Sequence, residues 1–136
     1  MVILGNHYRA TAHTRERDAV SRFYTTVLEC EKLSADGVTS GIPENIDLFI
    51  FTNGQVFGVE YLNDDTQCLS LAQNRQACWL EVKTDDKEAL KARCLEGGAI
   101  EITDYWDSGH FYFHAPGGQV FRIIGEDEEQ VTPTAP

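Results

Sequence analysis

Three charged side chains lie inside segments whose composition otherwise predicts β-strands: Arg9, Glu60 and Arg122. Charged groups are rarely buried unless they are paired. One interpretation is therefore an internal Arg–Glu–Arg ion cluster that fills space between strands. The other is a recognition site in which an arginine binds a ligand carboxylate or phosphate through its fork of donors. The sequence leaves both interpretations open.

Aromatic residues suggest a second kind of chemistry. Trp79 and Tyr112 lie on predicted strands and could form the floor of a small-molecule pocket, although packing within a sheet would explain them equally well. Trp106 lies in a predicted loop between Asp104 and Asp107. That loop could hold a cationic aromatic ligand through cation–π and charge contacts, or it could simply cover a hairpin or a dimer contact.

Two histidines flank Tyr112 with a spacing of two residues, so His110, Tyr112 and His114 share one face of a strand. Two such histidines could bind a metal ion, but the sequence offers no convincing carboxylate to join them. We therefore expect both to face solvent. The sequence contains no Ser–His–Asp arrangement, P-loop or Gly-rich nucleotide signature.

A repeated segment indicates how these residues are positioned. The sequence Gly-Gln-Val-Phe at 54–57 recurs at 118–121, and each copy follows an apolar strand and a Gly-containing turn. Each copy therefore predicts a β-hairpin. A four-residue match arises by chance about one time in ten in a chain of this length, but the agreement of the flanking strands strengthens it. A duplicated unit predicts the whole fold.

The chain divides into two similar units on this basis. Each unit reads as a strand, a helix and then three strands, with apolar residues at helical spacing in both helices. We predict a first module at 1–62, a connecting loop at 63–76, a second module at 77–125 and a disordered acidic and Pro-rich tail at 126–136.

Composition limits the partners. The 136 residues carry a formal net charge of −11, which repels nucleic acid and anionic membranes, so we expect neither as a partner. No apolar run approaches the ~20 residues of a membrane span, and the start of the chain lacks the features of a signal peptide. We expect a cytoplasmic protein. The four cysteines form no C-x-x-C pair, which argues against a zinc ribbon or redox motif.

Two longer motifs point to a known family. Phe-Tyr-Thr-Thr-Val-Leu at 23–28 resembles the first helix of the vicinal oxygen chelate superfamily, whose motif is FY-x-x-x-L(G). The segment 115–123 resembles its final hairpin. Members include glyoxalase I, bleomycin-resistance proteins, fosfomycin-resistance enzymes and extradiol dioxygenases. The resemblance implies an α+β fold of two βαβββ modules, each a curled mixed sheet with a helix on its outer face. Together these modules form a cup, and the chain forms a homodimer.

The resemblance also implies where a metal would be held. Enzymes of the family commonly use two His and two Glu, one from the first and one from the last strand of each module. The matching positions here carry Arg9, Gly58 or Glu60, Ala77 and Arg122. A guanidinium cannot ligate a cation. A substitute set built on His7, Glu60 and Glu81 would require shifted strand register. We therefore expect no metal and no cofactor.

Three functions remain open. The preferred one is a metal-free protein that binds a small organic molecule in the cup. The alternative is a lyase, isomerase or dioxygenase with a rearranged metal site, or an acid–base enzyme using Glu60 or Glu81. The third is a subunit that acts through protein contacts. The arginines favour an anionic ligand, whereas the net charge and the Trp106 loop favour a cationic one. The candidate ligand-binding residues are His7, Arg9, Glu60, Trp79, Glu81, Trp106, Tyr112 and Arg122.

Overall fold

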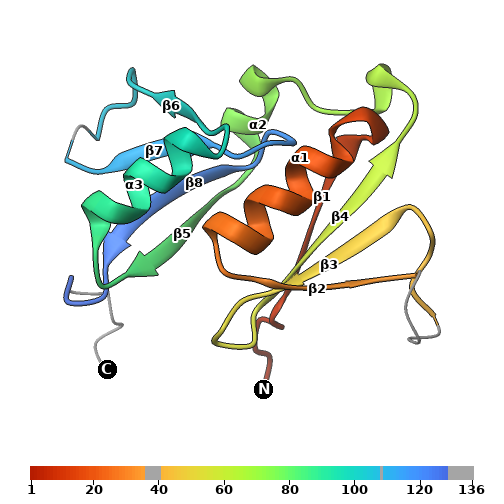
Figure 1. The fold of residues 1–136 in the computed structure, drawn as a ribbon, viewed down its shortest axis with the longest axis horizontal. Coiled ribbons are helices and arrows are strands. Elements are labelled where there is room, and N and C mark those ends of the chain that lie inside the picture. The colour runs from red at the N-terminus through yellow and green to blue at the C-terminus, as the bar shows by residue number, and fades with distance from the viewer. Residues whose placement is uncertain (36–40, 108, 129–136) are drawn as a thin grey trace.

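The computed structural model describes residues 1–35, 41–107 and 109–128, which form two separate four-stranded sheets with helices packed against them (Figure 1). Among these residues, no helix is long and apolar enough to cross a membrane. The predicted α+β class with two βαβββ modules is confirmed.

The first module has the strand order β1-β4-β3-β2, in which β1 runs parallel to β4 and the other neighbours are antiparallel. Its helical segment begins with a 3₁₀ turn, continues as α1 and ends in a π-helical turn. The strands are β1 (His7–His13), β2 (Glu31–Ser34), β3 (Ile46–Ile50) and β4 (Val56–Leu62). The helical turns are η1 (Thr14–Glu16), α1 (Arg17–Arg22) and η2 (Phe23–Val27).

The second module repeats this arrangement with the order β5-β8-β7-β6. Its helix begins at the N-cap Asp86, whose side chain accepts a hydrogen bond from the amide of Ala89. The elements are β5 (Trp79–Thr84), α3 (Lys87–Glu96), β6 (Ile100–Ile102), β7 (Phe111–His114) and β8 (Val120–Gly125).

Equivalent residues of the two hairpins make the same backbone hydrogen bonds. In the first, the amide of Phe51 donates to the carbonyl of Gln55, and the amide of Gly54 donates to that of Phe51, both at 2.9 Å. In the second, the residues sixty-four positions further along make the same two bonds, both at 2.8 Å. Gly54 has φ 88° and Gly118 has φ 108°, a conformation that costs a glycine nothing. The repeated tetrapeptide therefore marks a repeated backbone.

The segment 63–76 is more ordered than the predicted loop. It contains the 3₁₀ turn η3 (Asp65–Gln67) and most of α2 (Leu71–Ala77). Ser70 and Gln73 form a reciprocal capping box at the start of α2, a signal that the sequence carried and that the loop interpretation overlooked. Because α2 continues to Ala77, the next strand begins at Trp79, and the predicted start at Ala77 was wrong.

The predicted disordered tail also needs correction at its beginning. Glu126 donates its amide to the carbonyl of Thr84, and Glu128 accepts a hydrogen bond from the amide of Gly125. These bonds fold residues 126–128 back onto the second module. The remainder of the predicted tail, 129–136, lies outside the described residues.

Both modules bury their helix-bearing faces in one shared core. The ring of Tyr24 in η2 stacks on Phe49 and Phe57 of its own sheet, at centroid distances of 4.9 and 5.2 Å. It also contacts Phe121 of the other sheet at 6.0 Å. Burial of each such ring stabilises the fold by roughly 1.5–3 kcal/mol. The helices thus lie at the junction of the modules, whereas the resemblance had placed them on outer faces.

The opposite face of each sheet is turned away from this core, and we call it the open face of its module. Strand register places Arg9 beside Gly58 on the open face of the first module. It places Glu81 beside Arg122 on the open face of the second. Because the shared core lies between the two open faces, one chain does not enclose the expected cup.

Candidate ligand-binding site

Arg122 lies at the centre of a side-chain network on the open face of the second module. Its Nε donates to Glu81 Oε2 at 3.0 Å, and one of its terminal nitrogens donates to the same oxygen. The other terminal nitrogen donates to Asp107 Oδ2 at 3.2 Å. The pairing of β5 with β8 fixes the first contact, and the loop before β7 supplies the second. Two carboxylates therefore neutralise a single guanidinium.

Aromatic rings surround the guanidinium of Arg122. Its Cζ lies 4.8 Å from the ring centroid of Trp79 and 5.9 Å from that of Tyr112. The rings of Trp79 and Tyr112 meet edge to face at 6.2 Å, and Tyr105 meets Tyr112 in the same way at 4.6 Å. Trp79 remains 45% exposed, so it presents an accessible aromatic surface beside a fixed charge.

Asp107 connects the arginine to the rest of the network. Its Oδ2 also accepts hydrogen bonds from the hydroxyl of Tyr112 at 3.2 Å and from His110 Nδ1 at 2.9 Å. Its Oδ1 accepts from the amide of Gly109 at 3.0 Å. Burial acts to raise the pKa of Asp107, but the donors from His110, Gly109 and Tyr112 outweigh it and hold that pKa below its ordinary value. Asp107 is therefore a fixed anion.

His110 joins Asp107 to the C-terminal segment. Its Nε2 lies 2.9 Å from Glu128 Oε2, so each ring nitrogen contacts a carboxylate. Ionised carboxylates only accept hydrogen bonds, so the ring donates to both only when it is protonated. The bond to Glu128 raises the pKa of His110 against the effect of partial burial, and the bond to Asp107 adds to the rise. Hydrogen bonds from Gly125, Lys87 and His110 lower the pKa of Glu128 to about 2.

The first module's candidates lie elsewhere. His7 and Arg9 are exposed on β1 and Glu60 lies on β4, all on the open face of that module. Across the described parts of the chain, none of the three side chains makes a hydrogen bond or ion pair. The predicted Arg–Glu–Arg cluster therefore does not form within a single chain. Arg122 pairs with Glu81 and Asp107 and reaches neither Arg9 nor Glu60.

The loop around Trp106 does not form the predicted cluster. Trp106 is 91% exposed and projects from the surface. Asp104 pairs with Arg75 at 2.8 Å, and Asp107 points instead to Arg122. These contacts separate the two aspartates from the indole, so they do not frame a cation site together.

The structure also revises the residues at the family's metal positions. Ala77 belongs to α2, and the residue beside Arg122 is Glu81. The corrected set is Arg9, Gly58, Glu81 and Arg122. Only Glu81 could ligate a metal, and its carboxylate is already bonded to the arginine. Among the described residues, no group of three or more His, Cys, Asp or Glu side chains is placed to hold a metal ion. The set does not fit a divalent metal.

Three features in this part of the molecule escaped sequence reasoning. Glu128 carried no signal, since it belongs to an acidic run that reads as a tail. The spacing of His110 and Tyr112 correctly predicted one face, but their carboxylate partners come from a loop and from the C-terminal segment. His114 is only 4% exposed, and its Nδ1 lies 2.9 Å from the carbonyl of Gly118, so the predicted solvent-facing position was wrong.

The fold matches solved structures over nearly the whole chain. A glyoxalase/dioxygenase from Nostoc punctiforme is 15% identical with a TM-score of 0.63, covering 94% of this chain and 99% of that one. Fosfomycin resistance protein FosX from Mesorhizobium loti is 12% identical with a TM-score of 0.63, covering 90% and 91%. The bleomycin-binding protein of Streptomyces verticillus, solved with copper(II)-bleomycin, is 13% identical with a TM-score of 0.54, covering 93% and 99%.

These likenesses define the class of fold: paired βαβββ modules of the glyoxalase and bleomycin-resistance type. The chain therefore has the fold of the vicinal oxygen chelate superfamily, as the sequence motifs predicted. No family model matches the sequence, and no curated protein matches it. At these identities the likeness establishes the fold alone, and the function must be argued from the site.

Proposed function

We propose that this chain is a metal-free binding protein for a small aromatic molecule that is uncharged or cationic. The observation that carries the proposal is the network of Arg122, Glu81 and Asp107, which lies beneath an accessible Trp79. Because two carboxylates already neutralise Arg122, a ligand anion would have to compete with both of them. An aromatic body can instead lie against the indole without disturbing the network.

A second copy of the chain completes the site in this proposal. The open face of the second module leaves Trp79 45% and Ile100 53% exposed, and burial of such apolar groups favours association. The partner's first module would bring its own open face, with His7, Arg9 and Glu60, over the network. The cup then forms between two chains of a homodimer, with the cytoplasm as the expected compartment.

The two tryptophans provide the test. In Trp106→Phe the only remaining indole is Trp79, and saturable fluorescence quenching by aromatic cations or neutral aromatics is expected. In the matched variant Trp79→Phe the remaining Trp106 projects into solvent, and no saturable quenching is expected. Aromatic carboxylates serve as the charge control and should quench more weakly.

Elemental analysis after dialysis against Zn²⁺, Ni²⁺ and Mn²⁺ tests the absence of a metal. About one retained metal per chain would contradict the proposal and favour a metal-dependent lyase, isomerase or dioxygenase instead. Saturable quenching without retained metal would support the binding protein.

A further inference from the structure

The cluster of Arg122, Glu81 and Asp107 contains two carboxylates but only one guanidinium. Both carboxylates bond to Arg122, so these three side chains, the Arg122 network, leave one negative charge unbalanced. His110 lies at that charge, because its Nδ1 is 2.9 Å from Asp107 Oδ2, the atom that also accepts from Arg122 at 3.2 Å. A protonated His110 therefore balances the network, whereas a neutral His110 leaves it with an excess negative charge.

The other nitrogen of the His110 ring faces a pair of opposite charges. Its Nε2 lies 2.9 Å from Glu128 Oε2, and Lys87 Nζ donates to Glu128 Oε1 at 2.9 Å. Lys87 on α3 thus balances Glu128 on the C-terminal segment. Glu128 raises the pKa of Lys87, and Asp127 and Glu88 add to the rise, so Lys87 stays charged. The proton on His110 therefore decides whether the whole cluster is balanced.

Both carboxylates keep other donors when the histidine loses its proton. Asp107 still accepts from the amide of Gly109 at 3.0 Å and from the hydroxyl of Tyr112 at 3.2 Å. Glu128 still accepts from the amide of Gly125 at 3.0 Å. The neutral ring can also still donate to one of the two carboxylates. Loss of the proton therefore changes the charge of the cluster more than its geometry.

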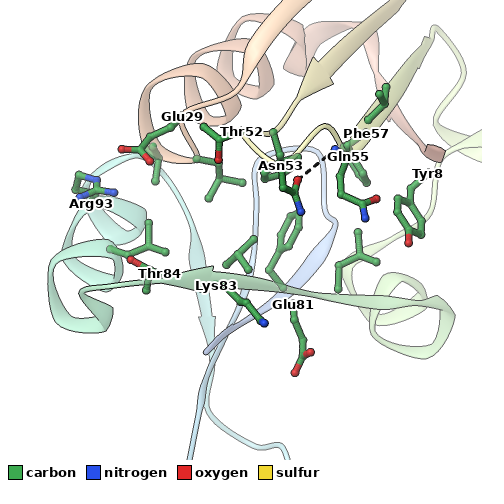
Figure 2. A pocket seen from close by; sticks show the side chains of 18 residues that line it. Tyr8, Glu29, Thr52, Asn53, Gln55, Phe57, Glu81, Lys83, Thr84 and Arg93 are labelled. Carbon is green, nitrogen blue, oxygen red and sulfur yellow. Dashed lines mark hydrogen bonds between the residues drawn. The ribbon is translucent and has the colours of Figure 1, made fainter. Parts of the chain in front are cut away.

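Solvent and a ligand can both reach this cluster. The side chain of His110 is 27% exposed and that of Arg122 is 20% exposed, so a proton can exchange while the charges remain partly shielded from water. Partial shielding strengthens the interaction between charges. Figure 2 looks into the groove between the modules and shows the side chain of Glu81 on the other side of β5. The Arg122 network is therefore reached from the open face, where Trp79 is accessible.

The contacts of His110 place its loss of a proton above the usual range. Its bond to Glu128 raises its pKa, burial acts in the opposite direction, the bond to Asp107 adds to the rise, and the charge of Arg122 opposes it. The pKa therefore lies above the ordinary value of about 6.5. Below that raised pKa the ring carries a positive charge, and above it the excess negative charge of the cluster is free to attract a cation.

We propose that a cationic aromatic ligand on the open face competes with the proton of His110 for this single negative charge. The ligand ring lies against Trp79, its positive charge takes the place of the imidazolium charge, and the proton passes to solvent. By reciprocity, the ligand binds more tightly when His110 is neutral. An uncharged aromatic ligand gives no such exchange. The inference rests on the function proposed above and adds that pH regulates it.

Titration calorimetry with 1-methylquinolinium, whose charge is permanent, tests the proposal at fixed ionic strength. Affinity is expected to be about fivefold higher at pH 9 than at pH 5.5, the effect of removing one charge roughly 10 Å away in a partly shielded site. Near the midpoint, titrations in two buffers of different ionisation enthalpy should show about 0.4 proton released per cation bound. The uncharged 1-methyl-2-quinolone should bind equally at both pH values.

Variants assign the exchanged proton to His110. His110→Gln should bind 1-methylquinolinium equally at both pH values and release no proton, which also separates His110 from His7 of a second copy. Glu128→Gln removes a negative charge beside the ring and should move the midpoint to lower pH. Lys87→Gln leaves the charge of Glu128 unbalanced and should move it to higher pH. Glu96→Gln, elsewhere on the surface of α3, is the matched control and should leave the midpoint unchanged.

The possible failures are distinguishable. Equal affinity for 1-methylquinolinium at both pH values would overturn this inference and leave the proposed binding function standing. The same pH dependence for the uncharged probe, or in His110→Gln, would also overturn it, because the cause would then lie elsewhere in the protein. No saturable binding of either probe at either pH would instead contradict the proposed function, and this inference with it.

Discussion

The two modules share a backbone but not a chemistry. Register places Arg9 beside Gly58 in the first and Glu81 beside Arg122 in the second. In the second module the two charges bond to each other, and Asp107 joins them. In the first, an arginine stands beside a glycine. The two modules therefore share these positions but carry different side chains at them. The open face of the second module pairs its charged side chains with one another. The open face of the first module leaves its charged side chains available to a group outside the module.

The largest expected difference between the modules is in stability. Arg122→Ala should lower the free energy of unfolding by about 2 kcal/mol, because it leaves two half-shielded carboxylates without their cation. Arg9→Ala, at the arginine on the open face of the first module, should change stability by less than about 0.5 kcal/mol. Urea denaturation measures both. Equal losses would mean that Arg9 has a partner that one chain does not reveal.

The next prediction concerns ligand affinity in the proposed homodimer. Trp79→Ala damages the second module's half of a cup and Arg9→Ala damages the first module's half, so each should weaken binding on its own, by about tenfold for the tryptophan. When the two variants are mixed and refolded, about one cup in four should regain full affinity, since it draws both halves from undamaged modules. Fluorescence titration of the mixture measures this fraction. If no cup recovers, both halves come from the same chain.

A smaller effect concerns pH. The folded protein raises the pKa of His110, so the protonated ring stabilises the fold. This stabilisation is fully present at a pH below the pKa of the unfolded state, about 6.5, and is lost as pH rises through the pKa of the folded state. The wild-type protein should therefore exceed His110→Gln in stability by about 0.5–1 kcal/mol at pH 5.5 and by less at pH 8.5. Urea denaturation at the two pH values measures the difference. An equal difference at the two pH values would contradict the prediction.

The smallest effect belongs to the exposed loop. Trp106→Ala should change the free energy of unfolding by less than about 0.5 kcal/mol, because the indole is 91% exposed. Thermal and urea unfolding should both coincide with the wild type. A larger loss would show that Trp106 is buried against a second copy.

Local patterns predicted the fold well because the signals are periodic. The apolar stripe of the first helix, the hairpin tetrapeptide at 54–57 and 118–121, and the alternation along β7 all have direct counterparts in the structure. The helix α2 was missed because its seven residues are mostly polar and give no apolar stripe, although Ser70 and Gln73 marked its start.

The candidate site could be predicted only in part, because pairing across strands depends on register. The position of Arg122 followed from its hairpin, but the interpretation that grouped it with Glu60 required both modules to line one cup. The register of β5 instead places Glu81 beside it. Asp107 and Glu128 reach the site from irregular segments, where no periodicity indicates direction. The way the two modules meet, with Tyr24 against Phe121, is likewise encoded by no local pattern.

The matching turns of the two hairpins have an evolutionary consequence. Each turn sets the phase of the strand that follows, so a single inserted or deleted residue there would carry Arg122 from the open face into the core. A substitution, in contrast, leaves this phase unchanged, although at Gly58 even a Cβ would lie 3.1 Å from Leu48 Cδ2, so that side chain would have to shift. Point substitutions can therefore change what this repeated frame recognises, whereas a change in turn length would disrupt its core.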